Sequence, residues 1–591
     1  MCGIFAYYGQ EKKSVSMVIE GLKKLEYRGY DSWGVAAANQ DDFFIKKAVG
    51  KIGSYKYKES DFPESKMIMG HSRWATHGGV TEINAHPHST ENNEIVLIHN
   101  GIIDNYLDIK KNLVTKGHIF ISETDTEVLA HLIQEYYEGD LAAAVQKSLK
   151  EIKGRYAILV MAKDNNKLIA ARRGSPLIIG VNKKNNEYFI ASDVPAFLQH
   201  TKSVIYLDDN QMAQIDKSGI IFKDLETDKQ VEKRVIEVSW NNEEAEKGKH
   251  KHFMIKEILE QKNTLKKAID QDDQQIIKIA DEIKKAFGTY LVGCGTAGKV
   301  CLTGTYFFAE IAKKHINFEF GSEFPYFKDF IREGSLLIVV SQSGETADTL
   351  EAIEAAKSKG AKILAIVNVE SSTMAREADH TLLLNAGPEK AVASTKATTA
   401  QLAILYLLSH ACNGGITEGK QILVRTAAEI NDMLNPRYEE HISKLAEKIK
   451  SVESMYIIGR GSNYPMALEA AIKLQEVSYI HAEGFAGGEL KHGPIALITK
   501  GTPCIALVAN DETKSDIISN ATEIKSRGGY IIGIAPENNE VFDYWIKVPD
   551  VGTASPIVNI IPIQILAYQL AVLRQNNPDM PRNLAKSVTV K

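Results

Sequence analysis

The sequence predicts an α/β protein of several domains, in which two β layers enclosed by helices precede two doubly wound α/β units. The chain has 591 residues and 44% hydrophobic composition, so it is too long for one hydrophobic core. Short apolar segments separated by turn residues dominate the first 240 residues or so. From about residue 271 the pattern alternates helix and strand and then repeats itself, which indicates a duplicated parallel-sheet unit.

The chain begins Met1-Cys2-Gly3-Ile4-Phe5. Aminopeptidase trimming is expected before a small residue, and removal of Met1 would leave a thiol and a free α-amine on the same carbon of Cys2. Such an amine has a pKa of about 7.7–8.0, so it can act as the general base for the neighbouring thiol. The alternative is that Cys2 is simply buried as a small hydrophobic residue.

Hydrophobic periodicity places the elements of the first domain. After an opening strand it predicts helices at 15–25, 104–116 and 124–137, and strands at 34–38, 67–71, 95–99, 156–162, 168–171, 177–181 and 204–207.

Polar clusters stand at the ends of these strands. They are 71–78 (HSRWATHG), 84–88 (NAHPH), 99–101 (HNG) and 122–127 (SETDTE). Asn100-Gly101 could be an ordinary turn dipeptide, and 122–125 could be only a helix cap. A thiol nucleophile, however, needs donors for a developing oxyanion, and an Asn amide with a Gly N–H suits that task. Arg73 can bind a carboxylate through two hydrogen bonds, and Asp125 can pair with an ammonium group.

The motifs CGIF, YRGYDS, RWATHG, NAHPH, HNGII and SETDTE, in this order, resemble the class II glutamine amidotransferase domain with its Ntn-hydrolase αββα fold. The resemblance implies that Cys2 is the nucleophile and that Asn100 and Gly101 form the oxyanion hole. It further implies glutamine binding by Arg73, Thr76, His77 and Asp125, with Trp74 as a gate for ammonia.

The second half begins after a polar, charge-rich linker at 240–252 and an amphipathic helix at 253–267. Tyr290-Leu291-Val292-Gly293 has its counterpart 166 residues later in Tyr456-Ile457-Ile458-Gly459. The two copies differ after their second apolar strand. Copy one has SQSGET at 341–346, where hydroxyls and a helix N-terminus suit a phosphate, whereas copy two has VANDE at 508–512. The alternative for SQSGET is a simple capped helix start.

Copy two carries Glu469, Lys473 and Glu476 on one helix and GGELKHGP at 487–494. Lys473 and Glu476 share a helix face. Two such residues are often only a solvated ion pair. The C-terminal segment PRNLAKSVTV at 581–590 is unusually apolar for a frayed end.

SQSGETADT, VASTK at 392–396, ELKHGP and NLAKSVTV resemble the isomerase half of the glutamine–fructose-6-phosphate aminotransferase family, which has two sugar-isomerase (SIS) domains. The resemblance implies a Schiff base on Lys586, proton transfer by Glu476, ring opening by His492 and a supporting role for Lys473. It assigns sugar-phosphate binding to Thr296, Ser341, Gln342, Ser343, Thr346, Val392 and Ala393. One residue departs from the family, because Ala297 stands where a serine commonly contacts the phosphate.

These motifs predict five segments: an amidotransferase domain at 2–240, a linker and connecting helix at 241–270, SIS domains at 271–415 and 440–580, and an active-site tail at 581–591. The expected substrates are L-glutamine and D-fructose 6-phosphate, with no cofactor and no metal, and the resemblance suggests a homodimer through the SIS half. Two alternatives remain open. One is a different glutamine-dependent transferase, such as one that uses a phosphoribosyl donor, and the other is a non-catalytic sugar-phosphate sensor.

Composition excludes other classes. The net charge of −5 favours neither a nucleic-acid nor a polyanion partner. The five cysteines form no CxxC pair, which argues against a disulfide framework or a structural zinc site. The N-terminus has no signal-peptide pattern. The apolar run at 556–573 is interrupted by Asn559, Pro562, Gln564 and Gln569, so a buried helix is expected there rather than a membrane span. We therefore expect a cytoplasmic protein.

Overall fold

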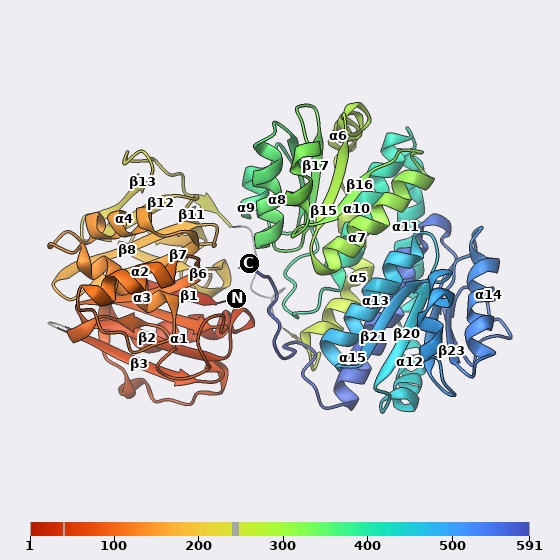
Figure 1. The fold of residues 1–591 in the computed structure, drawn as a ribbon, viewed down its shortest axis with the longest axis horizontal. Helices are drawn as coiled ribbons and strands as arrows, with labels where there is room; N and C mark the ends of the chain where they lie inside the picture. The colour runs from red at the N-terminus through yellow and green to blue at the C-terminus, as the bar shows by residue number, and fades with distance from the viewer. Residues whose placement is uncertain (1, 40–41, 239–246, 590–591) are drawn as a thin grey trace. The chain divides into compact units, whose positions relative to one another are not determined.

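The computed structural model describes residues 2–39, 42–238 and 247–589. It divides into two compact units, one of Met1–Asn242 with Ala585–Lys591 and one of Glu243–Leu584 (Figure 1). Met1 and residues 240–246 of the expected linker lie outside the described residues.

The first unit contains two antiparallel sheets in its described part. The larger has the order β14-β11-β9-β10-β1-β4-β2-β3 and the smaller the order β13-β12-β8-β7-β6-β5. The strands of the larger sheet are β1 (Gly3–Ser14), β2 (Ser32–Asn39), β3 (Asp42–Val49), β4 (Glu64–Arg73), β9 (Ile178–Asn182), β10 (Glu187–Ala191), β11 (Ser203–Tyr206) and β14 (Ile236–Glu237). Those of the smaller sheet are β5 (His88–Ser89), β6 (Ile95–Ile103), β7 (Gly154–Ala162), β8 (Asn165–Arg173), β12 (Gln211–Asp216) and β13 (Gly219–Asp224).

Helices cover the outer faces of both sheets. They are α1 (Val15–Lys24), α2 (Tyr106–Thr115), α3 (Asp125–Glu135) and α4 (Leu141–Glu151). Val18 and Leu22 of α1 join a core with the outer face of the larger sheet, whereas α2, α3 and α4 share a core with the smaller sheet. A third core, which includes Ile4, Met69 and Ile98, lies between the sheets. The predicted arrangement of two β layers enclosed by helices is therefore confirmed.

One predicted strand is confirmed but is longer than expected, which removes the turn alternative for Asn100-Gly101. The strand expected at 95–99 continues as β6 to Ile103, and Asn100 and Gly101 pair with Ala157 and Tyr156 of β7. Asn100-Gly101 is therefore not a turn. The hydrophobic pattern also missed β3, β10 and α4. β3 and β10 form hairpins with the strands just before them, β2 and β9.

The described part of the second unit contains two parallel sheets with the same strand topology. Their orders are β16-β15-β17-β18-β19 and β21-β20-β22-β23-β24. The strands are β15 (Thr289–Gly293), β16 (Asn317–Phe320), β17 (Leu336–Ser341), β18 (Lys362–Val367) and β19 (His380–Leu383), then β20 (Ser454–Gly459), β21 (His481–Ala486), β22 (Pro503–Leu507), β23 (Tyr530–Ala535) and β24 (Tyr544–Lys547). The repeated α/β unit is confirmed, and both copies are doubly wound.

The helices of the second unit are α5 (Phe253–Ile269), α6 (Asp273–Lys285), α7 (Gly295–Glu310), α8 (Ala347–Lys357), α9 (Thr373–Glu377), α10 (Lys396–Cys412), α11 (Ile416–Met433), α12 (Pro436–Ile449), α13 (Asn463–Ser478), α14 (Lys514–Lys525) and α15 (Ser555–Leu573). One continuous core joins α5, α10, α13 and α15 with one face of each sheet. By length and composition the stretch Gly552–Leu573 could cross a membrane, but 83% of its apolar window is buried inside the protein. It is a core helix, as expected.

Candidate active sites

Cys2 lies at the start of β1, the strand that pairs with β4 and β10 in the larger sheet. The backbone N–H of Trp74, just past the end of β4, donates a hydrogen bond to Cys2 Sγ at 3.3 Å. Burial raises the pKa of the Cys2 thiol above its ordinary value, although the Trp74 N–H and the Arg73 charge oppose that rise. The resting thiol is therefore protonated near neutral pH, and it needs a general base to become a nucleophile.

Asn100 and Gly101 lie beside Cys2, as predicted. Asn100 Nδ2 donates to the carbonyl oxygen of Cys2 at 3.1 Å. Gly101 has φ +135, and a Cβ there would lie 1.9 Å from the carbonyl oxygen of Arg155. Only glycine can therefore occupy this point of β6, next to the asparagine amide.

The residues expected to hold glutamine lie around the same point. Arg73 donates to the carbonyl oxygens of His77, Gly78 and Gly79, so the guanidinium is fixed by the loop that follows it. Asp125 opens α3 and accepts the backbone N–H of Ile103 at 2.9 Å.

The helix cap in this region comes from Thr124, whose hydroxyl accepts the N–H of Glu127. The capping alternative is therefore correct for Thr124, and it leaves Asp125 beside the site. These side chains line one small pocket, formed by Cys2, Arg73, Trp74, Thr76, His77, His86, His99, Gly101, Thr124, Asp125 and Thr126.

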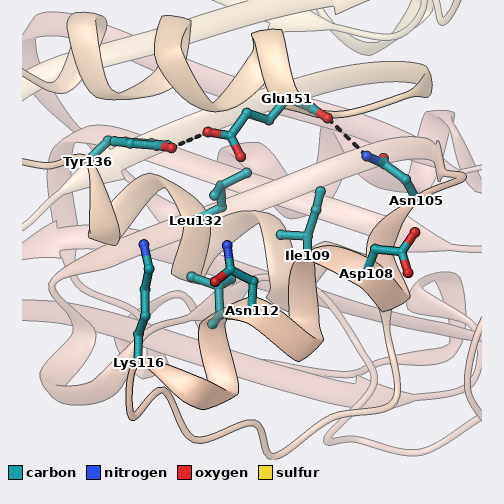
Figure 2. Close-up of a pocket in the computed structure, with 9 residues that line it drawn as sticks. Asn105, Asp108, Ile109, Asn112, Lys116, Leu132, Tyr136 and Glu151 are labelled. Atoms are coloured by element: carbon teal, nitrogen blue, oxygen red, sulfur yellow. Dashed lines mark hydrogen bonds between the residues drawn. The ribbon is translucent and has the colours of Figure 1, made fainter.

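A second pocket of about 290 Å³ lies among α2, α3 and α4 of the same unit (Figure 2). Asn105 Nδ2 donates to the carbonyl oxygen of Glu151 at 2.9 Å, and the Tyr136 hydroxyl is bonded to the Glu151 carboxylate. None of its lining residues was predicted to be functional.

In the second unit, the loop after β17 has the form expected of a phosphate site. Ser341 Oγ accepts the N–H of Gly344 at 3.0 Å and lies 3.4 Å from Thr346 Oγ1. Thr346 precedes α8 and its side chain makes no cap hydrogen bond to that helix. A helix N-terminus suits an anion such as a phosphate. Gly344 has φ +68, and a Cβ there would lie 2.1 Å from the Ser372 hydroxyl.

The corresponding loop of the second copy carries an acid instead of the serines. After β22, Asp511 accepts hydrogen bonds from the backbone N–H and the hydroxyl of Thr513, at 2.8 and 2.6 Å. A carboxylate at this helix start disfavours an anion by charge repulsion.

Helix α13 carries a buried cluster of charged residues. Lys473 and Glu469 are both 0% exposed, with their charged atoms 3.4 Å apart, and Lys473 is also bonded to Glu476. Burial raises the pKa of Glu469 to about 7. Burial alone would lower the pKa of Lys473, but the two carboxylates hold it above its ordinary value. The cluster is therefore not a solvated ion pair.

Sequence reasoning assigned no role to Glu469. Its Oε1 accepts the Thr296 hydroxyl at 3.1 Å, and its buried Oε2 has no hydrogen-bond partner among the residues that the structure describes. Glu469 thus joins α13 to α7, which carries the predicted sugar residue Thr296. The i,i+4 spacing to Lys473 was the one local signal for it.

The loop with Val392 and Ala393 is held by residues that no motif revealed. The Val392 N–H donates to the carbonyl oxygen of Asp579 at 3.0 Å. The buried Asp579 carboxylate accepts the N–H groups of Phe253 and Met254, the first two residues of α5, at 2.9 and 2.8 Å. Glu257 of α5 accepts the Lys390 N–H at 2.5 Å.

Two further residues, His492 and Lys586, were predicted to act on the sugar. His492 is exposed at the end of a short 3₁₀ helix, η8 (Glu489–His492). Lys586 belongs to the segment Ala585–Lys591, which groups with the first unit. Their roles remain predictions.

Comparisons with known proteins agree with both halves. A glutamine amidotransferase domain model matches residues 57–250, and an SIS domain model matches residues 282–411 and 448–574. The glutamine–fructose-6-phosphate aminotransferases (isomerizing) of Thermococcus kodakarensis and Caldanaerobacter subterraneus subsp. tengcongensis are 44% and 42% identical to this chain, over 100% of each chain.

A solved structure of the C-terminal domain of glucosamine-fructose-6-phosphate aminotransferase from Francisella tularensis is 34% identical, with a TM-score of 0.53. It covers 56% of this chain and 99% of that one. The fold of both units, the two groups of site residues and the full-length similarity lead to one conclusion: this chain belongs to the glutamine–fructose-6-phosphate aminotransferase (isomerizing) family.

Proposed function

We propose that this chain converts L-glutamine and D-fructose 6-phosphate to L-glutamate and D-glucosamine 6-phosphate. The observation that carries the proposal is the presence of both half-sites in one chain. An N-terminal cysteine lies beside an Asn–Gly donor pair, and a hydroxyl-rich phosphate loop belongs to the same unit as a buried Glu–Lys–Glu cluster.

In the first half-reaction, the Cys2 thiol gives its proton to the α-amine of the trimmed N-terminus, and Sγ attacks the side-chain amide carbon of glutamine. Asn100 Nδ2 and the Gly101 N–H donate to the oxyanion. The C–N bond then breaks as the nitrogen takes a proton and leaves as ammonia, and water hydrolyses the thioester to glutamate. Arg73, Thr76, His77 and Asp125 hold the α-carboxylate and α-ammonium ends of glutamine.

In the second half-reaction, the phosphate binds at Ser341, Gln342, Ser343 and Thr346, with Thr296, Val392 and Ala393 around the sugar. His492 opens the ring, and Lys586 forms an imine at C2 with loss of water. Ammonia displaces the lysine. Glu476 then takes a proton from C1 and returns it at C2, which leaves an aldehyde at C1 and an amine at C2. Lys473 supports the Glu476 carboxylate, to which it is bonded.

Neutral ammonia is the reactive species, and in bulk water near pH 7 most ammonia is protonated. We propose that Trp74 gates the release of ammonia from Cys2, since its backbone already contacts the nucleophile.

The test is incubation of the full-length chain with glutamine and fructose 6-phosphate, followed by assay of glutamate and amino sugar. Both products are expected. Glutamate without amino sugar would indicate a transferase with another acceptor, and no glutamate from a chain whose Met1 is removed would indicate a sensor. A Cys2→Ala variant should lose glutamate formation while it keeps isomerisation of the sugar phosphate.

We also propose a homodimer through the SIS half and a cytoplasmic location. The 3₁₀ helix η7 (Phe324–Phe330) exposes Tyr326, Phe327 and Phe330, which suits a protein interface. Replacement of Tyr326 and Phe330 by lysine should convert a dimer to a monomer in light scattering, and an unchanged mass would exclude this surface as the interface. All five cysteines are free, as expected in a reducing compartment.

A further inference from the structure

The side-chain amide of Asn100 can serve an oxyanion in only one of its two orientations. A carboxamide has two donors on Nδ2 and only acceptor sites on Oδ1. A rotation of 180° would place Oδ1 where the donors belong, and that oxygen would repel the developing negative charge. Some contact must therefore select the orientation.

His71 makes that contact. It lies on β4, across the inter-sheet core from β6, and it is 0% exposed. Its Nε2 atom is 3.0 Å from the backbone carbonyl oxygen of His99 and 3.0 Å from the side-chain oxygen of Asn100. A backbone carbonyl can only accept, so Nε2 must carry the proton. The Asn100 atom that faces Nε2 must then be Oδ1, and Nδ2 faces Cys2.

The ring is a fixed donor rather than an acid or a base. Burial lowers the pKa of His71 to about 3, and its buried Nδ1 atom has no hydrogen-bond partner within residues 2–39, 42–238 and 247–589. The ring stacks on His86 with centroids 4.1 Å apart, and the Arg73 and His99 side chains also disfavour a positive charge there. His71 therefore stays neutral throughout the pH range in which the α-amine of Cys2 titrates.

We propose that His71 is a positioning residue for glutamine hydrolysis, which fixes the Asn100 amide with its N–H donors toward the reacting carbonyl. This inference rests on the proposed function, because it assumes that Cys2 attacks glutamine. Its effect passes through Asn100 and not through a proton transfer of its own.

The first test replaces His71 by Phe and by Gln. His71→Phe should lower kcat for glutamine hydrolysis about 10- to 100-fold, below the effect of losing an oxyanion donor outright. KM for glutamine should change less than about threefold, because the glutamine ends are held elsewhere. His71→Gln retains a side-chain N–H and should recover part of kcat. The pH profile should keep its midpoint, whereas a shifted midpoint would assign His71 an acid–base role and overturn the proposal.

His131 gives a matched control, since it is a buried histidine of the same unit that is bonded to His118 and not to Asn100. His131→Gln should leave kcat within about twofold. Isomerisation of fructose 6-phosphate should be the same in every variant, which excludes general misfolding.

A double-mutant cycle gives the sharpest test. In an Asn100→Ala background, His71→Phe should lower kcat by less than about twofold, because the Asn100 amide that His71 orients is absent. A full tenfold further loss would contradict the proposal, and so would an unaffected His71→Phe single variant.

The tautomer of the His71 ring can be measured without an activity assay. A chain labelled with ¹⁵N-histidine should show the His71 proton on Nε2 by NMR at pH 7. A proton on Nδ1 would overturn the inference even if glutamine were not hydrolysed, whereas a wild-type chain that hydrolyses no glutamine would overturn the proposed function itself.

Discussion

At the scale of single residues, the proposed glutamine site is built from close approaches that side chains would block. Gly101 cannot be replaced without a clash with the Arg155 backbone, and Asn100 reaches Cys2 because its other amide atom is bound by His71. The motifs in the sequence marked these residues as candidates. Their conformation could not be predicted, because the positive φ at Gly101 depends on β7, a strand more than fifty residues away.

Ala297 gives a prediction at this scale. It lies in the first turn of α7, next to Thr296. Ala297→Ser should lower KM for fructose 6-phosphate by about tenfold or more, because one hydrogen bond to a charged group contributes about 1.5–3 kcal/mol. Steady-state kinetics with varied sugar phosphate provides the measurement, and KM for glutamine serves as the control. An unchanged or higher sugar KM would show that this serine makes no phosphate contact.

At the scale of elements, the N-termini of α5 and α6 are each capped by an aspartate carboxylate. Only one of these two aspartates also binds a loop of the proposed sugar site. Asp579 caps α5 and binds the Val392 loop through its own backbone. Asp272 caps α6 by accepting the Gln274 N–H at 3.0 Å and holds no sugar-site residue. A comparison of variants at Asp579 and Asp272 therefore distinguishes the stability that a helix cap contributes from the positioning of the Val392 loop.

Asp579→Ala should destabilise the second unit by about 1–2 kcal/mol, the usual cost of a lost cap, and should raise KM for fructose 6-phosphate several-fold. Asp272→Ala should cost a similar or smaller free energy without a change in KM. Thermal unfolding and steady-state kinetics on the same preparations provide both measurements. Equal KM values in the two variants would mean that Asp579 does not position the loop.

The histidine cluster across β4, β5 and β6 predicts how stability depends on pH. Burial lowers the pKa of His71, His86, His88 and His99. Below pH 6.5 the unfolded chain binds protons at these positions and the folded chain does not, so stability is present above pH 6.5 and is lost as the pH falls. The loss is about 1.4 kcal/mol per histidine for each pH unit at most.

Hydrogen exchange of β6 amides in the full-length chain, corrected for intrinsic rates, should therefore show weaker protection at pH 5.5 than at pH 7. Amides of β17 in the second unit serve as the internal control. His88→Gln should reduce the slope by about one quarter. A flat profile from pH 7 to 5.5 would mean that these histidines are protonated in the folded chain.

At the scale of the whole molecule, short-range motifs predicted both folds, and they supplied most of the candidate site residues, because each motif is contiguous in sequence. The repeat of β15 and β20 was readable for the same reason. The cap of α5 by Asp579 could not be predicted from the sequence. Phe253 and Asp579 are 326 residues apart, and no local sequence motif marks either residue. Glu469 was not predicted to be functional either, because its contact with the sugar-site candidate Thr296 joins the two SIS copies and leaves no local motif.

In the proposed reaction, nitrogen released at Cys2 is consumed at the sugar site of the same protein. The most direct measurement is incubation of the Met1-trimmed chain with fructose 6-phosphate and glutamine labelled with ¹⁵N at its side-chain amide, in the presence of unlabelled ammonium. Mass spectrometry should find the label at C2 of glucosamine 6-phosphate, and Cys2→Ala should abolish it. An amino sugar that carries only unlabelled nitrogen, or no amino sugar at all, would contradict the account.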